Sequence, residues 1–101
     1  MKKLQKSGNL SVDIQTILES LQSGDVIECL FAIKYCAINS ISDEKVLDTL
    51  QKLSRSDRFD MGCKVSDAAE AALFMIQEND YNGENRAVIE LIKNRFYEVR
   101  T

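Results

Sequence analysis

The chain has 101 residues, enough for one domain with a single modest core and too few for two. It carries 45% hydrophobic and 29% charged residues, no proline, no histidine and a net charge of −3, which favours one folded, helix-rich domain. The lack of histidine excludes Ser–His and Cys–His nucleophile systems, and the acidic balance argues against binding to nucleic acid.

Residues 1–10 form a polar, basic lead-in. No apolar stretch follows the lysines, as it would in a signal peptide. No apolar run anywhere in the chain approaches the roughly 20 residues of a membrane span. We therefore expect a cytoplasmic protein without membrane contact.

A first hairpin is predicted over residues 11–39. Ser11 suits the N-cap of its first helix, and Gly24 suits a left-handed conformation after that helix. Asp25 is expected to cap the second helix, over residues 26–39, whose apolar residues spread well beyond one stripe and predict a central position. The short connection makes the two helices antiparallel. The apolar face of the first helix consists of Ile14, Ile17, Leu18 and Leu21.

A second hairpin is predicted over residues 42–78. Ser42 is expected to cap its first helix. Residues 54–61 have no clear period and predict a loop in which Phe59 is an apolar anchor. The next helix, over about 62–78, is rich in inward-facing alanines that let a neighbouring backbone approach closely. The apolar face of the helix before the loop consists of Val46, Leu47, Leu50 and Leu53.

A final helix is predicted over residues 84–99, after a break at Asn82 and Gly83. Its inward positions are Val88, Leu91, Ile92, Phe96 and Val99. The chain is therefore predicted to be a single all-α domain of about five helices, arranged as antiparallel hairpins.

The two predicted hairpins repeat one apolar pattern, which is typical of helical repeat arrays. The stretch from residue 65 to residue 76 resembles the second helix of a HEAT repeat, with Ser66 in place of the usual arginine and Phe74 in place of the usual glycine. The positions that fit the HEAT pattern are Val65, Ala68, Ala69, Ala72, Leu73 and Ile76. The resemblance covers residues 12–78 and implies a HEAT-like, right-handed array of two repeats followed by a C-terminal helix. Because alanine runs also arise from helix propensity alone, a generic five-helix bundle is the alternative.

The three cysteines, Cys29, Cys36 and Cys63, give an odd count without a CxxC pair. With no histidine in the chain, this pattern predicts neither a metal site nor a bound cofactor. We expect three small core side chains in a reducing compartment, with a reactive regulatory thiol as the alternative.

No residue is predicted to be catalytic, and the expected function is to bind another protein. Residues 1–41 carry no net charge, so the negative charge lies in residues 42–101. Phe59 and Tyr81 fall in predicted loops and are the aromatic candidates for an exposed contact, although each could equally anchor its loop to the core. The acidic candidates for partner contact are Asp43, Glu44, Asp48, Asp57, Asp60, Asp67 and Glu70. The alternative for these carboxylates is a solvated surface.

A short, acidic, non-catalytic helical chain is similar in general character to the immunity proteins that bacteria use against nuclease toxins. That resemblance implies an inhibitor that occludes a basic active site, with carboxylates in the place of the substrate phosphates. The alternative is a small adaptor or assembly subunit with an apolar interface. Its contact residues would be Phe59, Met61, Tyr81 and Tyr97. The protein is expected to be a monomer or a weak homodimer.

Overall fold

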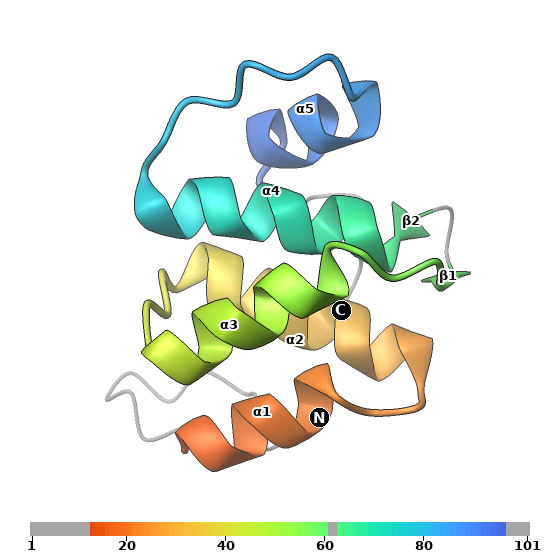
Figure 1. Ribbon diagram of the computed structural model, residues 1–101, viewed down its shortest axis with the longest axis vertical. Helices are drawn as coiled ribbons and strands as arrows, with labels where there is room; N and C mark the ends of the chain where they lie inside the picture. Colours follow the sequence, from red (N-terminus) through yellow and green to blue (C-terminus); the bar gives the residue numbers. More distant parts are fainter. Residues whose placement is uncertain (1–12, 61–62, 97–101) are drawn as a thin grey trace.

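The computed structural model describes residues 13–60 and 63–96, apart from the side chains of Phe59 and Asp60. This part of the chain forms five helices and one pair of short strands. The helices are α1 (Ile14–Leu21), α2 (Val26–Ile38), α3 (Glu44–Leu53), α4 (Val65–Gln77) and α5 (Arg86–Lys93), and the strands are β1 (Phe59–Asp60) and β2 (Cys63–Lys64) (Figure 1). The predicted all-α class with five helices is confirmed. The Cα radius of gyration of 12.3 Å is that of one folded domain of this length. No described helix is long and apolar enough to span a bilayer.

Three helices begin at an aspartate whose carboxylate accepts hydrogen bonds from the free N–H groups of the first turn. Asp25 caps α2 as predicted. The predictions of Ser11 and Ser42 as caps are wrong, because Asp13 caps α1 and Asp43 caps α3. A carboxylate accepts these hydrogen bonds and also interacts favourably with the positive end of the helix dipole, which favours the aspartates over the nearby serines.

The helix ends use the left-handed conformation at residues other than glycine. α1 ends at Leu21 with Gln22 as its C-cap, and Gly24 does not adopt the predicted left-handed conformation. The left-handed positions after three other helices are Ser40, Glu78 and Arg95, with φ of 52°, 56° and 50°. After Ser40, the N–H of Ile41 donates to the carbonyl of Cys36 at 3.0 Å, the hydrogen bond of a Schellman motif. Each of these three turns therefore holds a side chain where glycine would be less strained.

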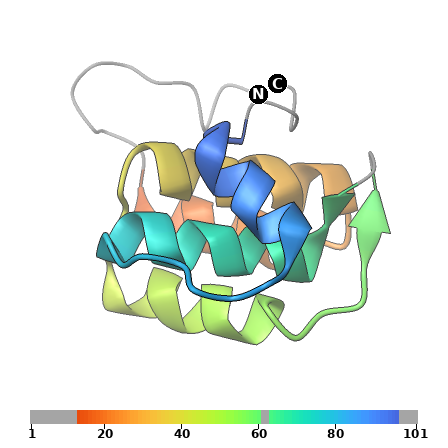
Figure 2. The ribbon, with the colours of Figure 1, turned by 90° about the horizontal axis from the view of Figure 1, so that it is seen from above.

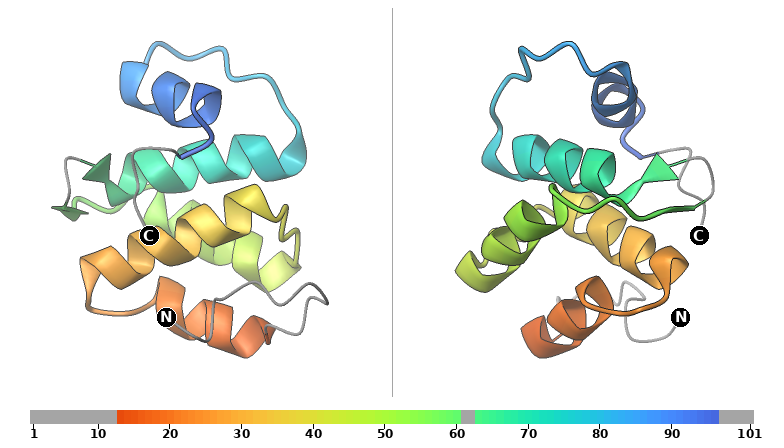
Figure 3. Two further views of the ribbon diagram at one scale, coloured as in Figure 1. Left: turned by 180° about the vertical axis from the view of Figure 1, so that it is seen from behind. Right: turned by 45° about the vertical axis from the view of Figure 1, so that its right-hand side comes forward.

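α4 lies at the centre of the helix packing. It packs against α2, α3 and α5, while α1 packs against α2 and α3. Figures 1 and 3 show α4 with α5 on one side and with α2 and α3 on the other. Four alanines of α4 have no exposed surface and let these neighbours approach its backbone closely: Ala68, Ala69, Ala71 and Ala72. α2, which was predicted to be central, packs between α1 and α4, and the small side chains of α4 let that helix contact three others.

The strand pair lies inside the segment that was expected to be a loop and the start of a helix. The antiparallel register pairs Phe59 with Lys64 and Asp60 with Cys63. The N–H of Val65 also donates to the carbonyl of Arg58 at 2.9 Å. Because residues 63 and 64 are held in this pairing, the helix begins at Val65 and not at residue 62 as predicted.

α5 is shorter than the helix predicted over residues 84–99. It begins after Asn85, whose side chain accepts from the N–H of Ala87. It ends at Lys93 because the next residues turn into the left-handed conformation, which aims Phe96 into the core, where its side chain is fully buried. The predicted inward position Val99 lies outside the described residues.

Candidate partner-binding surface

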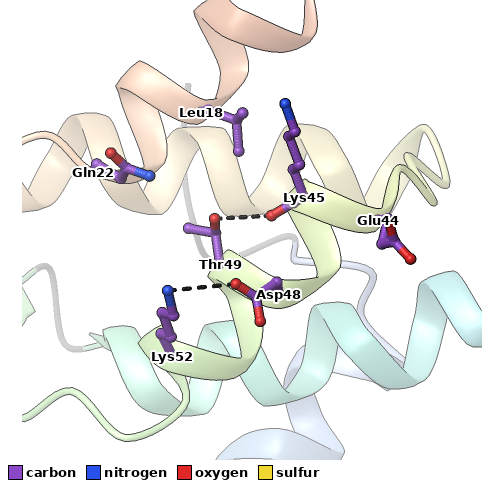
Figure 4. A pocket seen from close by; sticks show the side chains of 7 residues that line it. All are labelled: Leu18, Gln22, Glu44, Lys45, Asp48, Thr49 and Lys52. Carbon is purple, nitrogen blue, oxygen red and sulfur yellow. Dashed lines mark hydrogen bonds and ion pairs between the residues drawn. The ribbon is translucent and has the colours of Figure 1, made fainter.

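Two of the predicted acidic residues line an open groove between α1 and α3 (Figure 4). The groove has a volume of about 580 Å³. Its lining residues are Leu18, Gln22, Glu44, Lys45, Asp48, Thr49 and Lys52. Asp48 pairs with Lys52 at 3.4 Å across one turn of α3, and both side chains are largely exposed. With two carboxylates and two lysines, the groove has no net charge, so it suits a polar peptide segment better than a strongly basic one.

The hydroxyl of Thr49 forms the polar part of the groove floor. It is nearly buried and donates to the backbone carbonyl of Lys45 at 2.9 Å. This hydrogen bond uses the single proton of the hydroxyl, so Thr49 can only accept a hydrogen bond from a ligand. Leu18 of α1 supplies the apolar part of the surface.

Asp43 is a structural residue of α3. Its carboxylate accepts from the N–H groups of Lys45 at 2.8 Å and Val46 at 3.2 Å. Because both hydrogen bonds are needed to begin the helix, a partner that bound this carboxylate would compete with the cap. Glu44, the next residue, is exposed.

Asp67 also has a partner within the chain. Its carboxylate accepts from the side-chain amide of Asn85 at 2.9 Å, which ties the start of α5 to the first turn of α4. Glu70 is half-buried on α4, and Asp57 is exposed in the connection before β1. The side chains of Asp60 and Phe59 lie outside the described residues.

Tyr81 is half-buried and packs against the fold. Its ring meets Phe74 edge to face, with 5.0 Å between ring centroids, and its hydroxyl accepts from the N–H of Asn85 at 3.3 Å. A Cβ atom at Gly83 would collide with the end of the same side chain, so another residue there would have to displace the tyrosine. Tyr81 is therefore the anchor of the α4–α5 connection, which was the alternative expectation for this residue.

α3 begins and α4 ends at the same end of the molecule (Figures 1 and 2). We call this surface the acidic end and define it by the carboxylates at these two helix termini, half-buried Asp43 and the exposed residues Glu44, Glu78 and Asp80. Other exposed carboxylates, such as Asp25, Asp57 and Glu90, belong to other parts of the fold. Glu78 and Asp80 were missing from the sequence prediction. The antiparallel pairing of the third and fourth helices was the available signal, since it brings residue 44 and residue 78 to the same end. Asp67 and Glu70 lie toward the opposite end of α4, so the seven predicted carboxylates do not form one patch.

Two of the three cysteines belong to the core. Burial raises the pKa of the Cys29 thiol, an effect opposed by the positive charge of Arg58, and burial raises the pKa of Cys36 to about 12. Both thiols are therefore protonated at neutral pH and poorly reactive. Cys63 is half-buried at the start of β2.

The side chain that most clearly joins distant parts of the chain is Arg58, which the sequence did not single out. Its guanidinium donates to the carbonyl of Ser23 at 2.8 Å, connecting the segment before β1 to the turn between α1 and α2. The two residues are far apart in the sequence, so no local pattern could have predicted this contact.

Among residues 13–60 and 63–96, no three Cys, Asp or Glu side chains are placed to hold a metal ion. Comparisons with family models, with curated proteins and with solved structures gave no match to this chain. Any assignment of function therefore rests on the geometry and charge of the surfaces described above.

Proposed function

We propose that this chain is a non-catalytic protein-binding module whose acidic end docks on a basic surface of its partner, in the manner of an immunity protein that covers the active site of a nuclease toxin. The observation that carries the proposal is the acidic end itself. Glu44, Glu78 and Asp80 are exposed there, and only Asp43 is committed to capping a helix.

The electrostatic argument concerns encounter with the partner. Carboxylates that are gathered on one end create a negative potential that steers a basic partner toward that end and orients it. Salt screens such an interaction over about 8–10 Å at physiological ionic strength, so binding should weaken as salt is added. A cytoplasmic location, where such a partner would have to be neutralised before it reaches nucleic acid, is part of this proposal.

A HEAT-like arrangement is part of the same proposal. Its support is that corresponding helices of the two hairpins pack together, α1 against α3 and α2 against α4. Repeat arrays bind partners along surfaces formed by successive helices. In this arrangement the groove between α1 and α3 would be a secondary contact beside the acidic end.

The test begins with capture of a partner from lysate of the source cell at low and high salt, followed by measurement of association rates with the purified partner. The triple variant Glu44→Lys, Glu78→Lys, Asp80→Lys is expected to slow association about tenfold or more. The control, Asp57→Lys, Glu84→Lys, Glu90→Lys, makes the same change in net charge at exposed sites away from the acidic end. Equal effects of the two variants would show that only net charge matters and would remove the acidic end from the proposal.

The second candidate is an adaptor with an apolar interface, which is favoured by exposed isoleucines on two helices. Of the contact residues predicted for it, Tyr81 is half-buried against the fold, while Met61, Tyr97 and the side chain of Phe59 lie outside the described residues. Within residues 13–60 and 63–96, the large apolar side chains that are exposed are isoleucines on α2 and α5: Ile27, Ile38 and Ile89. If the captured partner binds as tightly at high salt as at low salt, the apolar adaptor is favoured over docking through the acidic end.

A further inference from the structure

The connection between α4 and α5 contains the only Asn–Gly pair of the sequence, Asn82 followed by Gly83. Both residues are exposed and lie outside the helices. The residues around them are positioned by Tyr81, whose hydroxyl accepts from the N–H of Asn85 at 3.3 Å. The end of the Tyr81 side chain also lies against Gly83. The pair is therefore open to water within a connection that is anchored to the fold.

Asn82 differs from the other asparagines of the described residues in how its amide is held. Three of those others donate hydrogen bonds from their side-chain amides, at 2.9, 2.9 and 3.3 Å: Asn39, Asn85 and Asn94. Within the described part of the chain, no hydrogen bond involves the side chain of Asn82 or the N–H of Gly83. Asn79 is exposed in the same connection but is followed by Asp80. Among the described asparagines, Asn82 thus combines an unbonded amide with a following glycine.

We propose that Asn82 is a site of spontaneous deamidation, in which water replaces the side-chain amide through a cyclic imide formed with the backbone nitrogen of Gly83. Glycine favours the ring because it lacks a Cβ atom, so the backbone can turn its nitrogen toward the asparagine side chain. A nitrogen without a hydrogen bond within the fold can also lose its proton to hydroxide. By contrast, the N–H groups of Ser40 and Arg95, which follow two other asparagines, donate to carbonyls at helix ends.

The reaction consumes a water molecule and releases ammonia. The deprotonated nitrogen of Gly83 bonds to Cγ of Asn82, and the bond between Cγ and Nδ2 breaks as Nδ2 takes a proton from water and leaves as ammonia. Hydroxide then adds to either carbonyl carbon of the ring, and the ring nitrogen takes up a proton as its bond to that carbon breaks. Addition at Cγ gives an aspartate at position 82. Addition at the backbone carbonyl carbon gives an isoaspartate, whose main chain is longer by a methylene.

Deamidation changes both the charge and the length of the connection. Either product adds a negative charge to a segment with several exposed carboxylates: Glu78, Asp80 and Glu84. The isoaspartate also lengthens the chain between Tyr81 and Asn85, whose hydrogen bond positions the start of α5. It should move Gly83 relative to the tyrosine side chain that lies against it. We therefore expect deamidation to loosen the attachment of α5 to α4. The inference does not depend on the proposed function.

The first test incubates the full chain at neutral and mildly alkaline pH and follows each asparagine by peptide mass spectrometry. Deamidation at Asn82 is expected to be at least about tenfold faster than at Asn79, because glycine leaves the attacking nitrogen unhindered. Asn79 is the internal control, since it is exposed in the same connection and differs in the residue that follows it. The rate at Asn82 should also rise with pH, because the attacking nitrogen must lose its proton.

The second test measures hydrogen exchange of the α5 amides. These amides are expected to exchange at least about threefold faster in the deamidated chain than in the fresh chain. Asn82→Gln is the matched control, because it keeps an exposed amide but has to close a larger ring and reacts far more slowly. After the same incubation, that variant should exchange like the fresh chain. Asn82→Asp carries the charge without the extra methylene and should accelerate exchange less than isoaspartate formation does.

Three outcomes would overturn parts or all of the proposal. Asn82 could deamidate no faster than Asn79, which would mean that the connection holds the Asn–Gly pair in a conformation that blocks ring closure. The deamidated chain and the incubated Asn82→Gln variant could exchange equally at α5, which would mean that the modification leaves α5 in place. Asn82→Asp could exchange as fast as the chain with isoaspartate, which would assign the effect to charge instead of to the longer main chain.

Discussion

At the residue scale, the cysteines and Arg58 show how burial decides what a side chain can do. Cys36 lies in the core, where burial keeps its thiol protonated. The guanidinium of Arg58 donates a hydrogen bond to a backbone carbonyl within the chain. The sequence predicted the core role of Cys36 from its type alone. The role of Arg58 depends on the turn at Ser23 and could not be predicted before the fold was known.

The raised pKa of Cys36 predicts a loss of stability at alkaline pH. The pKa is about 12 in the folded chain, against an ordinary value of about 9, so only the unfolded chain loses the proton between these values. The contribution is fully present below about pH 9 and falls by at most about 1.4 kcal/mol per pH unit above it. Urea unfolding at pH 8 and pH 10 measures this slope, which should be smaller in Cys36→Ala. An unchanged slope in that variant would contradict the prediction.

Removal of the Arg58 guanidinium should destabilise the fold. Arg58→Ala leaves the carbonyl of Ser23 without its charged donor, and we expect a loss of about 1–2 kcal/mol in the free energy of unfolding. Arg55→Ala is the control, because Arg55 is an exposed arginine nearby and should change stability by less than about 0.5 kcal/mol. Chemical denaturation of both variants tests the difference, and similar values would refute a specific role for Arg58.

At the element scale, local signals predicted where helices exist, and tertiary contacts decided where they end. Asp25 was predicted as a cap because capping depends on neighbouring residues only. The apolar period of the last helix continues beyond Lys93, yet the burial of Phe96 turns the chain there. The short strands at residues 59–64 likewise depend on backbone pairing, which has no period in so short a segment. The acidic end was only partly predicted for the same reason, since the pairing of α3 with α4 decides that Glu78 and Glu44 lie at the same end of the molecule.

The left-handed helix ends predict a stabilising substitution. Ser40 has φ of 52°, which costs a residue with a Cβ atom more than it costs glycine. Ser40→Gly is expected to raise the free energy of unfolding by about 0.5–1 kcal/mol. Ser42→Gly, the same change at an exposed residue outside the left-handed region, should lower it slightly or leave it unchanged. Thermal unfolding compares the two, and no gain for Ser40→Gly would mean that strain at this turn is negligible.

At the scale of the whole molecule, the acidic end has a defined place. It lies where α2 leads into α3 and where α4 ends (Figure 1). The strand pair lies at the opposite end of α4, where that helix begins. A basic partner bound at the acidic end would therefore leave the strand pair uncovered.

The attachment of α5 has a consequence for the order in which the fold comes apart. α5 packs chiefly against α4 and is held at its start by Asn85 on Asp67 and by the ring of Tyr81. Its departure would uncover one side of α4 while the contacts among α1, α2, α3 and α4 persist. We therefore expect that detachment of α5 needs less free energy than any other partial unfolding of the described fold. The remaining four helices would then unfold together in the global transition.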